Sequence, residues 1–260
     1  MRALASLILL AACARNSSPD LDSAAAAVDS SDSVSAEGNV MMANMDGADM
    51  AFQGAITADQ VTTRIAANVA LRWIPSSCAT VSSSGNTVTI TYNDCTGPRG
   101  LVHVTGELTL VVTVTGVGAI SVHGSSPDFE VNGAHLVISL DAAYTVSGTS
   151  HSLDVTTDGS GTGPLGNSIE HQGDYTVTWD TGTLCHSITG DWSTEFSNAT
   201  TSATRSNQVQ MSRCAGGCPT GSVIHTGLRG VTLTLEFDGT NIASWSTSTG
   251  RSGTINLPCQ

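Results

Sequence analysis

The sequence predicts an all-β domain, an antiparallel meander of long hairpins that forms a sandwich or a barrel, with one short N-terminal helix. Ser and Thr together make up more than a quarter of the 260 residues. After Cys78, apolar and polar residues alternate with period two over many segments. Thr is β-branched and suits the exposed side of a pleated sheet. Period-two alternation places the apolar side chains on one face.

A short helix is expected over residues 58–73, ahead of the first strand. Thr57 or Asp59 can cap its start, and Pro75 follows its end. Three apolar residues recur every four positions, which is the spacing of one helix face. They are Val61, Ile65 and Val69.

The strands are expected from Cys78 onward, and the longest alternating run spans residues 136–146. Glycine-containing turn sequences separate the runs, and Asn-Gly and Asp-Gly are strong signals for tight hairpins. Connections of this length favour neighbouring antiparallel strands. The expected turns are Ser83-Ser84-Gly85-Asn86, Gly97-Pro98, Asn132-Gly133, Asp158-Gly159, Thr181-Gly182 and Asp238-Gly239.

The chain is acidic and contains no lysine, with 9 arginines against 22 acidic residues and a net charge of −13. This charge repels phosphate backbones, so nucleic acid is not an expected partner. The absence of lysine excludes a Walker lysine and a Schiff-base lysine. No cofactor motif is present, and no cofactor is expected.

The N-terminus has the features of an export signal. Arg2 precedes a short apolar run, Ala3 to Leu10, which is too short to span a bilayer. The expected organisation is a signal peptide at 1–12, an acidic disordered linker at 13–51 and a single β-rich domain at 52–260. The linker assignment rests on its Ser, Ala and Asp content and its few bulky apolar residues.

The signal ends in Leu10-Ala11-Ala12-Cys13, which resembles the lipobox of bacterial lipoproteins. The resemblance implies cleavage before Cys13 and attachment of diacylglycerol and fatty acyl chains (palmitate) to that cysteine. Because Ala14 and not Asp follows, it also implies delivery to the outer membrane, facing the periplasm or the surface. A plain secreted protein, cut near Ala12, is the alternative.

Six cysteines remain if Cys13 is lipidated, and an even number suits disulfides in an oxidising compartment. Cys78 and Cys95 flank a turn, so a hairpin brings them together. The favoured pairing of the others is Cys185–Cys214 and Cys218–Cys259, and a Cys214–Cys218 bridge is the competing option. A structural zinc site at the late cysteines is a weaker alternative.

No catalytic residue is identified, and the seven histidines are interpreted as exposed strand residues. The best local group for a divalent metal is His171 and Asp174 with His186 and Asp191 in the next hairpin, but these residues are interpreted as surface polar residues beside a turn, and no metal site is assigned. The tryptophans at 179, 192 and 245 alternate with apolar residues and are interpreted as core. If two of them proved exposed on one face, a carbohydrate-binding role would be favoured.

The sequence therefore favours a cell-envelope lipoprotein with a structural, adhesive or interaction role and no enzymatic activity. Its lipobox, cysteines and composition resemble cysteine-paired, β-rich lipoproteins of GC-rich Gram-negative bacteria. Its expected partners are the membrane, through the lipid anchor, and an envelope protein or glycan. A glycan- or small-ligand-binding module and a metal-dependent hydrolase are the alternatives.

Overall fold

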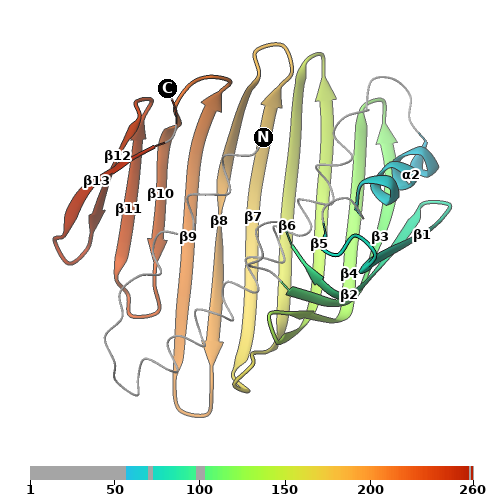
Figure 1. Ribbon diagram of the computed structural model, residues 1–260, viewed down its shortest axis with the longest axis horizontal. Coiled ribbons are helices and arrows are strands. Elements are labelled where there is room, and N and C mark those ends of the chain that lie inside the picture. Colours follow the sequence, from blue (N-terminus) through green and yellow to red (C-terminus); the bar gives the residue numbers. More distant parts are fainter. Residues whose placement is uncertain (1–56, 70–72, 98–102, 258, 260) are drawn as a thin grey trace.

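The computed structural model describes residues 57–69, 73–97, 103–257 and 259, and these form one antiparallel sheet of 13 strands and one helix. The predicted all-β meander with a short N-terminal helix is confirmed (Figure 1). The helix is α2 (Ala58–Val69). The strands are β1 (Ala79–Ser84), β2 (Thr87–Thr96), β3 (His103–Gly116), β4 (Ala119–Val131), β5 (Ala134–Ser147), β6 (Ser150–Thr162), β7 (Ser168–Asp180), β8 (Cys185–Ser197), β9 (Ser202–Cys214), β10 (Thr220–Thr226), β11 (Thr232–Asp238), β12 (Ile242–Thr247) and β13 (Ser252–Asn256).

Each strand pairs with its neighbour in sequence, so the spatial order runs from β1 to β13 without a crossover. In the described part of the chain the two end strands, β1 and β13, are not paired with each other. The sheet is therefore open and not closed into a barrel. This order follows from the short turns between consecutive strands, which leave antiparallel neighbours as the simplest arrangement.

Helix α2 begins with a capping box. The Gln60 amide donates to Thr57 Oγ1 at 3.3 Å, and the Thr57 amide donates to Gln60 Oε1 at 3.1 Å. The helix buries Val61, Ile65 and Val69 against the first three strands. Its predicted end was too late, because the helix stops at Val69 and Trp73 is not helical.

The first strands bend away from the long central ones. The register shifts between Tyr92 and Cys95 on β2, between Gly106 and Thr109 on β3, and between Ser126 and Phe129 on β4. Such bulges kink a strand and increase its twist. Because they occur on three neighbouring strands, β1 and β2 lie at a steep angle to the central strands (Figure 1).

The bend encloses an aromatic cluster of Trp73, Tyr92 and Phe129. The Tyr92 ring contacts Trp73 at 5.1 Å and Phe129 at 5.6 Å between centroids, both edge to face. All three side chains are buried. Gly106, at φ +126°, makes the bend possible, because a Cβ there would lie 2.7 Å from the Asp128 carbonyl oxygen.

The sheet has two chemically different faces, named here the inner and the outer face. The inner face carries Leu136, Ile138, Leu140, Ala142 and Tyr144 on β5, all at most 5% exposed. The alternate residues of β5, including Val137 and Asp141, point to the outer face and are mostly exposed. The main core therefore lies on the inner face of β2–β6 and is partly covered by α2.

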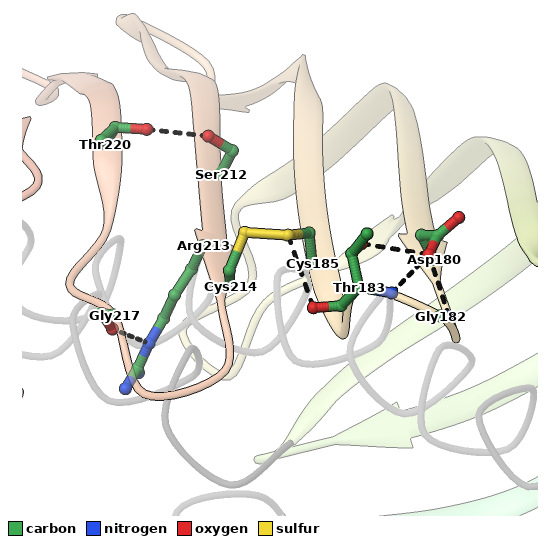
Figure 2. The surroundings of a disulfide bond; sticks show 9 residues. All are labelled: Asp180, Gly182, Thr183, Cys185, Ser212, Arg213, Cys214, Gly217 and Thr220. Atoms are coloured by element: carbon green, nitrogen blue, oxygen red, sulfur yellow. Dashed lines mark hydrogen bonds between the residues drawn. A yellow bond between two sulfur atoms is a disulfide. The ribbon is translucent and has the colours of Figure 1, made fainter.

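Three disulfides are present, and they are the three pairs that the sequence favoured: Cys78–Cys95, Cys185–Cys214 and Cys218–Cys259. Cys185 and Cys214 are register partners on β8 and β9 (Figure 2). Cys218–Cys259 ties the end of the chain to the segment between β9 and β10. Three disulfides indicate an oxidising, non-cytoplasmic compartment.

One expected turn was wrong, and another lies partly outside the described residues. Asp158-Gly159 was predicted as a turn but lies inside β6, whose partners β5 and β7 continue past it on both sides. Pairing along both edges overrides the local turn preference of the dipeptide. The Gly97-Pro98 turn lies partly outside the described residues. Cys13, the signal at 1–12 and the linker at 13–51 lie wholly outside them.

Candidate functional site

The inner face continues beyond the main core onto β7–β12, where its side chains are less completely covered. Among the described elements, only α2 lies outside the sheet, and its contacts are concentrated on β1–β3. The apolar side chains on the inner face of β7–β12 are therefore half-buried in many cases, in contrast to those of β3–β5. They include Val177, Trp179, Ile188, Trp192, Val223, Leu235 and Trp245. This region is named here the β7–β12 face.

The charges of the central strands are separated between the two sides of the sheet. From β5 to β11, every strand carboxylate falls at an outer-face position of the register. The only two arginines of these strands, Arg205 and Arg213 on β9, fall at inner-face positions. The inner face of these strands therefore combines apolar and aromatic side chains with positive charge and has no carboxylate.

One cross-strand row of the inner face joins His151, Trp179, His186 and Arg213 from β6 to β9. The Trp179 ring stacks on His151 at 5.2 Å and 12°. The hydroxyl of Tyr144 lies 2.6 Å from His151 Nδ1. Burial, and then the charge of Arg213, lower the pKa of His186. This row thus ends in a single fixed cation beside a histidine that favours its neutral form.

Arg213 is held in place at the end of β9. Its Nε donates to the Gly217 carbonyl oxygen at 2.8 Å. Figure 2 shows the side chain extending from β9 toward the loop that contains Gly217, close to the Cys185–Cys214 disulfide. The bond at Nε orients the planar guanidinium and directs its two Nη groups away from that contact.

Two further histidines of the inner face are buried or half-buried. His171 Nδ1 lies 2.9 Å from Thr194 Oγ1, and burial lowers its pKa to about 4. His225 Nδ1 lies 2.7 Å from Asn207 Oδ1, and burial together with Arg205 lowers its pKa to about 4. Both imidazoles are therefore neutral at pH 7.

The interpretation of all seven histidines as exposed was wrong for four of them. His103, His123 and His135 are exposed, but His151 and His171 are each 7% exposed and His186 and His225 are half-buried. The sequence carried a usable signal, because His171 has the same odd-even phase as Ile169 and Tyr175. His186 likewise shares the phase of Ile188 and Trp192.

The four residues proposed as a metal group do not meet. Asp174 and Asp191 are register partners on the outer face of β7 and β8. His171 and His186 lie on the inner face of the same strands, so the sheet separates the imidazoles from the carboxylates. In the described residues no group of three or more His, Cys, Asp or Glu side chains is arranged to hold a metal ion.

The outer face has a shallow hollow of about 390 Å³ over β5–β9. Its lining includes Asp158 and the register partners Glu170 and Glu195, together with serines and Thr204. The hollow is acidic and open.

The predicted core position of the tryptophans is refined by the structure. Trp179, Trp192 and Trp245 share the inner face but are half-buried. The indole of Trp245 covers Gly253 on the neighbouring strand, where a Cβ would lie 2.8 Å from the ring. These tryptophans therefore belong to the β7–β12 face and are not displayed on the outer, hydroxyl-rich face.

No protein family, curated protein or solved structure matches this chain. No helix in the described ranges has the length and apolar character required to cross a bilayer. The class defined by the structure is a disulfide-bonded, non-cytoplasmic, all-β protein with an open meander sheet.

Proposed function

We propose that this protein is a lipid-anchored component of a bacterial outer membrane that binds a partner on the β7–β12 face and has no catalytic activity. The lipobox-like Cys13 and the signal at 1–12 support the anchor. The three disulfides support an exported domain. The segment at 13–51 serves as the tether between membrane and domain.

The observation that carries the interaction role is the incomplete cover of the inner face. The core side chains of β3–β5 are almost fully buried, whereas many of those on the β7–β12 face are only half-buried, beside a smaller buried cluster that includes Met211 and Phe237. An apolar surface that the described residues leave partly uncovered is a typical binding surface. Two of the three disulfides, Cys185–Cys214 and Cys218–Cys259, join segments at the ends of strands in this part of the sheet.

The anchor is tested by substituting Cys13→Ser and following incorporation of labelled palmitate in a Gram-negative host. The wild-type chain and the Ala14→Ser control are expected to take up label and fractionate with the outer membrane. The Cys13→Ser chain should carry no label. Mass spectrometry of the mature N-terminus must show acylated Cys13, and an unmodified or uncut N-terminus would contradict the proposal.

The binding face is tested with a neutral, apolar fluorescent probe and the purified mature protein. We expect saturable binding that weakens when Ile188→Ala or Leu235→Ala shortens a side chain of the β7–β12 face. Val137→Ala is the matched control, because Val137 is an exposed apolar residue of the outer face. Circular dichroism checks that each variant is folded. Equal loss in Val137→Ala, or no binding by the wild type, would refute the binding role.

A further inference from the structure

Four buried polar atoms on β7 and β8 have no hydrogen-bond partner among the described residues. They are the Tyr175 hydroxyl, Trp179 Nε1, His186 Nε2 and Trp192 Nε1. The register places all four residues on the inner face, within two adjacent strands. Buried polar groups are nearly always paired in folded proteins, so a cluster of unpaired ones requires an explanation.

The chemistry of these atoms specifies what could pair with them. An indole N–H can only donate, and a phenol or a neutral imidazole can also donate. Burial raises the pKa of Tyr175, so this phenol keeps its proton. The missing partner must therefore supply acceptors. Since the surrounding side chains are aromatic and aliphatic, it must also have an apolar body.

The charges on the inner face indicate that the acceptor group is anionic. Arg213 lies in the same row as Trp179 and His186, and its guanidinium is oriented by the bond to Gly217. The planar guanidinium matches a carboxylate with two parallel hydrogen bonds. The absence of any carboxylate on the inner face of β5–β11 removes the repulsion that such a ligand would meet.

From this complementarity we propose that the β7–β12 face binds a long-chain fatty acid. Its carboxylate pairs with Arg213, and its hydrocarbon chain lies over Ile188, Trp192 and Val223. This inference rests on the proposed function, because it assigns a ligand class to the same face. The inner face of β9 between Arg205 and Arg213, which carries Asn207, Val209 and Met211, spans about 26 Å at ~3.3 Å per residue, long enough for a single extended chain.

A glycan fits this face less well. Sugar hydroxyls donate as well as accept, so a sugar site needs carboxylate or amide acceptors beside its aromatic rings. The inner face of β7–β9 offers donors and the arginines of β9 but no carboxylate, and the amide oxygen of Asn207 already lies 2.7 Å from His225 Nδ1. The carboxylates of these strands lie on the opposite side of the sheet, away from the tryptophans.

The test compares palmitate with hexadecanol, the neutral alcohol of the same chain length, on purified mature protein by isothermal titration calorimetry. We expect palmitate to bind at least tenfold more tightly than hexadecanol. Arg213→Gln should remove this difference and leave hexadecanol binding unchanged. Arg251→Gln is the matched control, because Arg251 is exposed in the turn between β12 and β13. Trp179→Phe, which keeps an aromatic ring but loses the indole donor in the row of Arg213, should also weaken palmitate binding.

The outcomes separate the ligand class from the proposed function. Equal binding of palmitate and hexadecanol, or no effect of Arg213→Gln, would overturn the fatty-acid assignment while the apolar binding face stands. No binding of either compound by a folded protein would overturn both. Tighter binding of a neutral oligosaccharide than of palmitate would also overturn the assignment and favour a glycan site.

Discussion

The packing of Leu140 against Gly124 gives the sharpest test of the inner-face core. These residues are register partners on β5 and β4, and Leu140 is 1% exposed. Leu140→Ala should lower the free energy of unfolding by about 3–5 kcal/mol, the upper part of the range for buried leucines. The reason is that Gly124 has no side chain that could move into the space.

A second substitution tests this reason directly. A methyl group on Gly124 would lie 3.0 Å from Leu110 Cδ2 and 3.3 Å from Leu140 Cδ2. Gly124→Ala alone should therefore overpack the site and cost about 1–2 kcal/mol. In the Leu140→Ala background the same methyl group enters the cavity, so the double variant should be more stable than the sum of the two losses by about 1–2 kcal/mol.

The measurement is urea unfolding under oxidising conditions, followed by tryptophan fluorescence and circular dichroism. Val137→Ala is the control, since Val137 lies on the outer face of the same strand and is 54% exposed. Its cost should stay within about 0.5 kcal/mol, as for most surface changes. If the stability losses of Leu140→Ala and Gly124→Ala simply add in the double variant, the reasoning is refuted. Equal losses for Val137→Ala and Leu140→Ala would likewise refute the assigned faces of β5.

Three further predictions concern charge and covalent structure. Hydrogen bonds from the Thr183 backbone and from neighbouring hydroxyls hold the pKa of Asp180 below its ordinary value of 3.8. Urea unfolding should therefore show that Asp180→Ala is destabilising at pH 7 and that the loss of stability shrinks as the pH falls below 3.8. A loss that stays constant with pH would contradict this prediction. Burial lowers the pKa of His171 to about 4. The free energy of unfolding should therefore fall on acidification from pH 6.5 to 4, by at most about 1.4 kcal/mol per pH unit. The His171→Gln variant should show a weaker pH dependence in the same assay. Replacing Cys218 and Cys259 by serine opens a loop with a sequence separation of 41. In the chain-entropy model this should lower the free energy of unfolding by about 4 kcal/mol. A decrease below about 1 kcal/mol in urea unfolding would show that the disulfide adds little stability.

The parts of the fold that depend on local chemistry were predictable from the sequence. The alternation at residues 136–146 identified β5 and its buried face, because strand periodicity is a property of the backbone. The turn at Gly85 and Asn86 pairs β1 with β2 and so brings Cys78 and Cys95 together, as the disulfide shows. The helix start at Thr57 was predictable from its capping chemistry, whereas its end depends on the chain that follows.

The parts that depend on several strands at once were not predictable. The bulges at Tyr92, Gly106 and Ser126 make sense only as one bend across three strands. The Asp158-Gly159 pair has a strong turn signal, yet the ladders on both sides keep it extended. The alternative of a metal group at residues 171, 174, 186 and 191 is not supported, because these residues are close in sequence but differ in odd-even phase along the strands. That phase already separates His171 from Asp174.

The architecture favours binding on a face of the sheet over binding at its edges. An open sheet has two edge strands whose unpaired backbone groups can recruit another chain, and short edge strands limit this risk. Here the edge strands β1 and β13 have 6 and 5 residues, whereas the central strands β3–β9 have 13 or 14. The edges therefore offer little backbone for pairing. The apolar surface that the described structure leaves half-covered is on the inner face of long, continuously paired strands, where positive charge and unpaired donors are also found.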